Sequence, residues 1–262
     1  MPKENSKTQM EKDIVLLLAG AVVGSMNAIA GGGMLVGFPV LIALGIPPLA
    51  ANATTGVVTA PGQIASAFGY RKYLRRVPLR YALLLLPCVI GGAAGALTLR
   101  HTPADDFAHI VPLLILFGVM LFTFQPLLHF HLSNHLKGRK KTWLPLAFIG
   151  LAMLPVSFYG GYFGAGYGLM MLAFLGYTSL PDVHMINSMK NVAAAFMSIT
   201  SVICLYSAHL INWHAGLIMA VGSTTGGYTG ARYAQKVSSH WLRVGIIAIG
   251  MAAVITLGVR QY

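Results

Sequence analysis

NAIAGGGMLVGFPVLIALGIPPLAANATT, residues 27–55, is the stretch that decides the fold. Three consecutive glycines interrupt an apolar run, and glycine both weakens a helix and frees the backbone to turn or to approach a ligand closely. Inside a bilayer, irregular backbone persists only where protein buries it or a wet cavity satisfies its N–H and C=O groups. The stretch therefore predicts a broken membrane helix beside a candidate binding site.

The composition predicts that the whole chain is embedded in a membrane. Hydrophobic residues make up 56% of the 262 residues and charged residues only 9%, whereas soluble domains average about 25% charged residues. About eight spans of about 20 residues each leave no room for a soluble domain. We therefore expect an all-α polytopic membrane protein, a single transmembrane domain over residues 1–262, located as a multi-pass protein in the cell inner membrane.

The formal net charge of +12 does not indicate a nucleic-acid binder. The basic residues cluster in short segments between apolar runs, at residues 71–80 and 137–141. Such clusters mark cytoplasmic loops, and no soluble module exists to present base-reading groups. We expect the lipid bilayer as a partner and no nucleic acid.

The sequence contains an internal repeat. A second glycine-rich break follows at residues 160–168, and polar and glycine positions recur in the same order as in the first half. The matched pairs are Gly33–Gly164, Gly37–Gly168 and Gly45–Gly176 at a spacing of 131, and Asn52–Asn187, Gly91–Gly226, Gly92–Gly227 and Gly95–Gly230 at a spacing of 135.

Two repeated halves follow from these matches. Repeat 1 covers about residues 14–130 and repeat 2 about residues 143–259, joined by a basic cytoplasmic loop at about 131–142. Segments one (14–44) and five (143–174) are each broken at a glycine-rich stretch.

Two topologies are compatible with the charge distribution. If all eight segments cross, both ends lie in the cytoplasm; if segments one and five are re-entrant, the ends lie outside and the repeats are inverted. Counts of Lys and Arg on each side do not separate these arrangements, and we favour eight crossings. In either case transporter designs bind substrate near the midplane, between the halves.

Residues 31–55 resemble the signature of the sulfite exporter TauE/SafE family of membrane permeases. The likeness consists of a glycine cluster, a proline a few residues later, Gly-x-x-Pro, and Ala-x-Ala-Thr; in the second half, NSMKN (187–191) stands where the first has NATT. The resemblance implies two related halves that transport a small anion, such as sulfite, a sulfonate or another sulfur-containing anion. A sulfur oxyanion or organosulfonate is then the expected partner.

The chemistry of the break favours an anion independently of the resemblance. Helices that restart at residues 31–34 and 164–167 present free N–H groups and the positive end of a helix dipole, although glycines also permit close helix packing. Lys190 is the only Lys or Arg well inside an apolar segment, where it would neutralise an anion unless it extends to the interface. Nearby amides and hydroxyls would bind the anion oxygens or hold helices together. The predicted substrate-binding residues are Gly31, Gly32, Gly33, Asn52, Thr54, Thr55, Gly164, Gly166, Asn187, Ser188, Lys190 and Asn191.

Other function classes fit the sequence less well. No GxSxG, HExxH or GxxxxGK[ST] motif occurs, so we expect neither an enzyme nor an ATPase. No residue pattern calls for a metal or a cofactor. The alternative function is a non-enzymatic partner or scaffold of another complex, and an intramembrane enzyme is a less favoured one. The sequence leaves open which anion is carried and whether the chain forms an oligomer.

Overall fold

The computed structural model describes residues 6–124, 145–233 and 251, and all regular structure in this part of the chain is helical. The predicted eighth segment (240–259), apart from residue 251, and the basic loop (131–142) lie outside the described residues, as does the end of the fourth segment. The elements are α1 (Ser6–Ile29), α2 (Met34–Ala43), α3 (Pro48–Gly69), α4 (Arg71–Leu74), η1 (Leu79–Leu84), α5 (Leu85–His101), α6 (Ala104–Thr123), α8 (Leu146–Tyr162), α9 (Tyr167–Leu175), α10 (Val183–Tyr206) and α11 (Trp213–Tyr233).

Several helices have the length and composition of membrane spans. Four of the described segments meet both criteria: Lys7–Ile29, Leu79–His101, Ala104–Thr123 and Val183–Tyr206. Large apolar side chains such as Leu79 and Leu113 are exposed on the outside of the bundle, as expected where lipid is the solvent. The chain is an all-α polytopic membrane protein.

Short irregular stretches separate α1 from α2 and α8 from α9. Gly31 has φ +82° and Gly164 has φ +87°, a conformation that other residues adopt only with strain. These two glycines are 133 residues apart, as are the ends of α1 and α8 and the starts of α2 and α9. The structure therefore matches Gly31 with Gly164, two residues away from the match with Gly33 that the sequence comparison gives.

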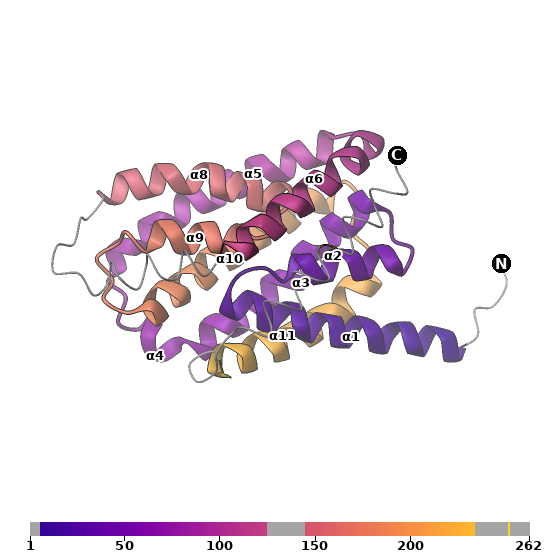
Figure 1. Cartoon of the computed structure of the whole chain (residues 1–262), viewed down its shortest axis with the longest axis horizontal. Coiled ribbons are helices and arrows are strands. Elements are labelled where there is room, and N and C mark those ends of the chain that lie inside the picture. The colour runs from indigo at the N-terminus through magenta and orange to yellow at the C-terminus, as the bar shows by residue number, and fades with distance from the viewer. Residues whose placement is uncertain (1–5, 125–144, 234–250, 252–262) are drawn as a thin grey trace.

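The second part of each broken segment turns back along the first. A Cβ atom added to Gly37 of α2 would lie 3.0 Å from the side chain of Val23, well before the end of α1. In the second half, α9 likewise lies beside α8 (Figure 1). This arrangement differs from the eight full crossings favoured by the sequence and matches the re-entrant alternative. Segment length cannot distinguish a full crossing from a re-entrant segment, because a second helix of the same length and composition can either continue across the membrane or return.

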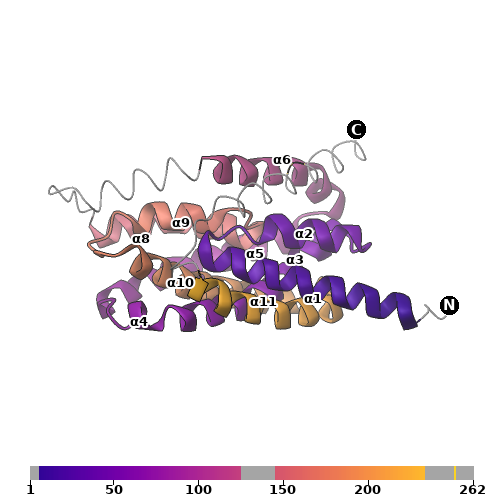
Figure 2. The ribbon, with the colours of Figure 1, turned by 60° about the horizontal axis from the view of Figure 1, so that its bottom comes forward.

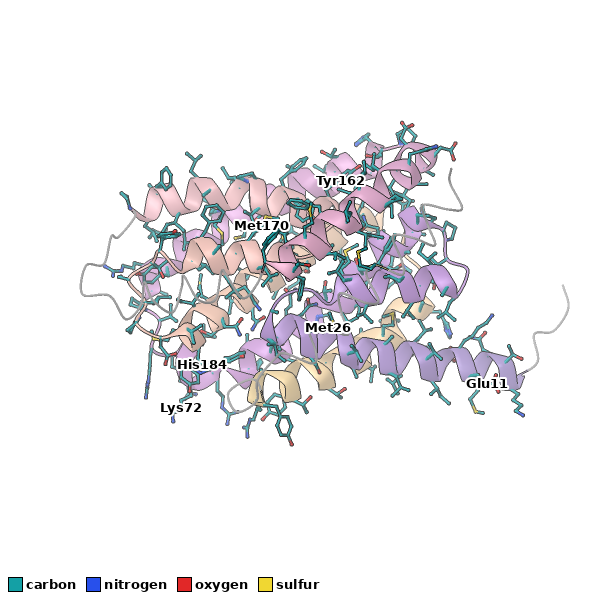
Figure 3. All side chains as sticks on the ribbon, in the orientation of Figure 1. Glu11, Met26, Lys72, Tyr162, Met170 and His184 are labelled. Atoms are coloured by element: carbon teal, nitrogen blue, oxygen red, sulfur yellow. The ribbon has the colours of Figure 1, made fainter. Side chains whose placement is uncertain are left out.

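The two broken segments enter the molecule from opposite ends. In Figure 1, α1 starts at the right of the molecule and α8 at the left, the end at which α4 also lies. Figure 3 shows Glu11 of α1 and Lys72 of α4 at opposite ends. Basic residues of the 71–80 segment lie at the α4 end, which the positive-inside rule assigns to the cytoplasm. The first helices of the two broken segments thus run in opposite directions, and the positive-inside rule would put the start of α1 on the outer side.

Each broken segment packs mainly against a helix of the other half. α1 lies along α11, α8 lies along α5, and α3 and α10 pack against each other between these pairs (Figures 1 and 2). The backbones approach closely: an added Cβ on Gly226 would lie 1.9 Å from the Ala21 carbonyl oxygen, and one on Gly95 would lie 2.1 Å from that of Phe158. Small residues at such contacts are typical of membrane helix packing.

Substitution at this contact should be costly. We expect Gly226→Ala to destabilise the protein by about 1–3 kcal/mol, because the added methyl group must push α11 away from the α1 backbone. Thermal unfolding of the purified protein in detergent measures the effect. Gly150→Ala is the matched control, since its Cβ would meet nothing closer than 3.7 Å and alanine favours a helix. Equal unfolding temperatures for the two variants would contradict the packing described here.

The inverted arrangement predicts the sidedness of two exposed positions. In a variant lacking Cys88 and Cys204, a cysteine at Lys7 should react with a membrane-impermeant thiol reagent from the outer side only. A cysteine at Lys72 should react from the cytoplasmic side only. Intact cells and inverted membrane vesicles provide the two exposures. Labelling of both positions from one side would instead support an even number of crossings between them.

Candidate functional site

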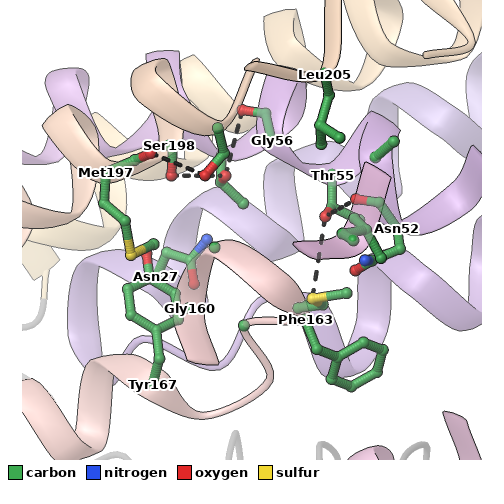
Figure 4. A pocket seen from close by; sticks show the side chains of 17 residues that line it. Asn27, Asn52, Thr55, Gly56, Gly160, Phe163, Tyr167, Met197, Ser198 and Leu205 are labelled. Carbon is green, nitrogen blue, oxygen red and sulfur yellow. Dashed lines mark hydrogen bonds between the residues drawn. The ribbon is translucent and has the colours of Figure 1, made fainter. Parts of the chain in front are cut away.

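A cavity of about 40 Å³ lies between the two halves. This volume accommodates a few water molecules, since about 10–15 Å³ of such space holds one. Side chains from α3 and α10 form two of its walls, and the ends of both broken segments reach it (Figure 4). The lining residues are Asn27, Met34, Asn52, Ala53, Thr55, Gly56, Thr59, Leu99, Gly160, Gly161, Phe163, Gly164, Tyr167, Met197, Ser198, Ser201 and Leu205.

Two asparagines in the cavity wall have amide atoms without a partner. Asn27 is 3% exposed, and its Oδ1 accepts a hydrogen bond from the Gly33 N–H at 2.9 Å. Its Nδ2 has no partner among the described residues, and neither has Oδ1 of Asn52. Buried polar atoms are costly unless they are hydrogen-bonded. Asn27 therefore has N–H groups available for a molecule in the cavity.

Asn52 and Asn187 cap the broken helices in a crossed manner. Nδ2 of Asn52 in α3 donates to the Tyr162 carbonyl at the end of α8, at 2.8 Å. Nδ2 of Asn187 in α10 donates to the Ala28 carbonyl near the end of α1, at 3.0 Å. The last carbonyls of a helix have no partner within the helix. Each half thus supplies an amide that satisfies a carbonyl of the other half.

Lys190 serves the end of α1 as well. The side chain is 1% exposed, and Nζ donates to the Asn27 carbonyl at 2.8 Å. A cation is favoured there because the C-terminal end of a helix carries partial negative charge. No carboxylate pairs with Lys190 in the described part of the chain. Its charge therefore lies next to the backbone of Asn27 but outside the set of residues that line the cavity.

The predicted site residues fall into two groups in the structure. Asn52, Thr55 and Gly164 line the cavity. The other predicted residues lie behind its walls or at the ends of the broken helices, and several side chains bond to nearby backbone, as Ser188 does to the Met185 carbonyl at 2.7 Å. The residues that do not line the cavity are Gly31, Gly32, Gly33, Thr54, Gly166, Asn187, Ser188, Lys190 and Asn191.

Several cavity residues are missing from the sequence prediction. Asn27 precedes the glycine cluster within the opening stretch, and Thr59 lies one helical turn after Thr55, so both were visible signals. Thr59 donates to Ser198 Oγ at 3.2 Å and so links α3 with α10 across the cavity. Tyr167 is held by a hydrogen bond from Gln63. Ser198 carries no local signal, because only the packing of α10 against α3 brings it to the cavity.

Two helix starts also meet at the cavity. α2 begins at Met34 and α9 begins at Tyr167, and both of these residues belong to the lining. Since the N-terminal N–H groups of a helix attract anions, the two restarts favour a negative ligand even though none of the described lining residues is charged. No Asp or Glu is among the described lining residues. The described residues hold no group of three His, Cys, Asp or Glu side chains arranged to bind a metal.

Known proteins resemble this chain over most of its length. A family model described as sulfite exporter TauE/SafE matches residues 16–257. A probable membrane transporter protein of Haemophilus influenzae is 32% identical over 243 residues, 89% of each chain.

Two further relatives carry similar descriptions. The probable membrane transporter protein ORF9 of Sinorhizobium is 27% identical over 250 residues, 92% of this chain and 90% of the relative. The probable membrane transporter protein YfcA of Escherichia coli K12 is 26% identical over 245 residues, 90% of this chain and 85% of the relative. No solved structure matches the chain.

The crossed cap should contribute to stability. We expect Asn187→Ala to lower the free energy of unfolding by about 1–3 kcal/mol, because the Ala28 carbonyl is left buried without a donor. Thr98→Ala is the control, since that hydroxyl is exposed and bonds only within its own helix. Thermal unfolding of both variants in one detergent gives the comparison. A variant at position 187 as stable as the control would mean that the cap is dispensable.

Proposed function

The chain belongs to the sulfite exporter TauE/SafE family, and we propose that this membrane transporter is a permease that binds a small anion in the cavity between its two halves. The observation that carries the proposal is the unpaired Nδ2 of Asn27 in a cavity whose described lining has no acidic residue. A buried N–H donor without a partner favours an anionic ligand with acceptor oxygens.

The electrostatics of the surroundings support an anion. The starts of α2 and α9 contribute positive helix ends, and the ammonium group of Lys190 lies 2.8 Å from the carbonyl of Asn27. Interactions between charges strengthen in a low-dielectric interior. A cation would meet repulsion from all three sources, whereas an oxyanion would be attracted by them.

The size of the cavity and the family together favour a sulfur oxyanion. A cavity of about 40 Å³ suits sulfite or a short organosulfonate better than a larger metabolite. In this proposal the substrate site comprises Asn27, Asn52 and Thr55, with Gly164 allowing close approach of the backbone. Transport proceeds by alternating access of two inverted repeats around this site, in the cell inner membrane, and involves no chemical reaction.

Anion flux into proteoliposomes tests the proposal. We expect saturable uptake of one of sulfite, thiosulfate, sulfate or a short sulfonate. Asn27→Asp should reduce this uptake at least about tenfold, because it replaces the free N–H donors with a repelling oxygen while keeping the acceptor for Gly33; about 1.4 kcal/mol of lost binding energy suffices for that factor. Lys190→Met should reduce uptake similarly, since the nearby positive charge is lost.

Two controls make the result interpretable. Thr98→Ala should transport at the normal rate. Because Lys190→Met also removes the donor to the Asn27 carbonyl, its thermal unfolding in detergent is measured beside its uptake, and uptake is compared per amount of folded protein. If no sulfur anion moves, the proposed substrate class is wrong; if uptake is unchanged in Asn27→Asp and Lys190→Met, the proposed site is wrong.

A further inference from the structure

The internal repeat pairs the residues that line the cavity with a second set of residues at equivalent positions. A spacing of 135 residues relates α3 to α10, so Asn52, Thr55 and Thr59 correspond to Asn187, Lys190 and Ala194. In the reverse direction, Ser198 and Leu205 correspond to Gln63 and Tyr70. The first members of these pairs line the cavity, as do Ser198 and Leu205, and the cavity reaches the ends of α5 and α10 that lie away from α4. Among the counterparts, Asn187 and Tyr70 are hydrogen-bonded to each other next to the start of α4.

The counterpart residues form a closed region. Tyr70 is 0% exposed and Lys190 is 1% exposed. The hydroxyl of Tyr70 accepts a hydrogen bond from Asn187 Nδ2 at 3.0 Å. Tyr70 also packs with Ala28 at the end of α1 and with Ala231 of α11. Its counterpart Leu205 has no polar group and lines the cavity.

The closed region contains polar atoms with no partner among the described residues. Neither amide atom of Asn191 is hydrogen-bonded, and the same holds for Oδ1 of Asn187. Asn191 is fully buried, and unpaired polar atoms in a membrane interior are expensive. Helix packing alone does not require them, because an apolar side chain of similar size, such as leucine, would fill the space without this cost. A small oxyanion that enters in another conformation would give the N–H groups of Asn191 an acceptor, and water that enters with it would give the amide oxygens donors.

We propose that Asn187, Lys190 and Asn191 form a second, closed half of the anion site, which opens toward the cytoplasm when the cavity on the outer side closes. The proposal rests on the proposed anion transport. The ligand is the same small oxyanion, held by the Lys190 ammonium and by amide N–H groups. Because the two repeats are related by symmetry, each half can adopt in turn the conformation of the other, which closes one half of the site and opens the other.

Tyr70 is the gate of this closed half. Its ring lies 6.5 Å from that of Tyr73 and 6.2 Å from that of His184. Tyr73 in turn borders a hollow of about 630 Å³ that is also lined by Arg71, Lys72 and Arg232. A basic hollow next to the gate attracts anions at the cytoplasmic surface.

Cysteine accessibility tests the proposal without a known substrate. In a protein lacking Cys88 and Cys204, Ala194→Cys reports on the closed half and Thr59→Cys, at the corresponding position, reports on the open cavity. A membrane-impermeant thiol reagent is applied to inverted vesicles for cytoplasmic exposure and to intact cells for outer exposure. Each reporter cysteine is placed in three proteins, which have the native Tyr70, Tyr70→Phe or Tyr70→Ala.

The proposal expects opposite responses of the two reporters. Cytoplasmic modification of Ala194→Cys should rise about fivefold with Tyr70→Phe, which loses only the hydrogen bond to Asn187, and at least about tenfold with Tyr70→Ala. Outer modification of Thr59→Cys should fall in the same proteins. Because Tyr70→Phe keeps the ring, it carries the test if Tyr70→Ala does not fold.

Other outcomes overturn the proposal. Unchanged modification of Ala194→Cys with Tyr70→Phe and Tyr70→Ala, while Thr59→Cys reacts from the outer side, would mean that the region is only structural. A rise in both reporters together would indicate loosening of the fold in place of an exchange. The readout is independent of flux, so a failure to transport sulfur anions would refute the substrate and leave the opening of this half to be judged by labelling alone.

Discussion

Two helices of this protein end inside it, and their last carbonyl groups must find donors that the bilayer does not offer. Asn187 and Lys190 supply them for α1, and Asn52 does so for α8. These donors come from the opposite half in each case, so neither broken segment is complete without the other repeat. A helix that is capped by the other half must also pack against that half. This accounts for the close backbone contacts of α1 with α11 and of α8 with α5.

Much of the fold was predictable from local patterns. Composition and apolar run lengths give an all-α membrane protein, and the pairing of Asn52 with Asn187 identifies two residues that make equivalent contacts. The direction of α2 was not predictable, because its residues are equally suited to continuing past Gly33 or to returning along Val23. The pairing of the two breaks was also not predictable: the sequence match pairs Gly33 with Gly164, whereas the structure pairs Gly31 with Gly164. Both Gly31 and Gly164 are left-handed, and a run of three glycines does not reveal which one adopts that conformation.

The candidate site was predictable only in part. Asn52 and Thr55 are polar residues next to a break and line the cavity. Lys190 stands out in the sequence as a buried cation, but the sequence does not reveal that its nearest partner is the backbone carbonyl of Asn27. A sequence pattern shows which face of a helix is polar, but it does not show which neighbouring helix contacts that face. Asn27 was missed for a related reason: its Oδ1 holds the Gly33 N–H, and the availability of its Nδ2 depends on that single bond.

The crossed caps also constrain how the chain is made. Ala28 receives its hydrogen bond from a residue 159 positions later, and Asn27 receives one from a residue 163 positions later. When α1 leaves the ribosome and enters the membrane, neither donor has been synthesised. The end of α1 must then stay close to water, or against the insertion machinery, until α10 arrives. Biogenesis of this protein therefore includes an interval in which the first half is inserted but not yet able to settle in the lipid.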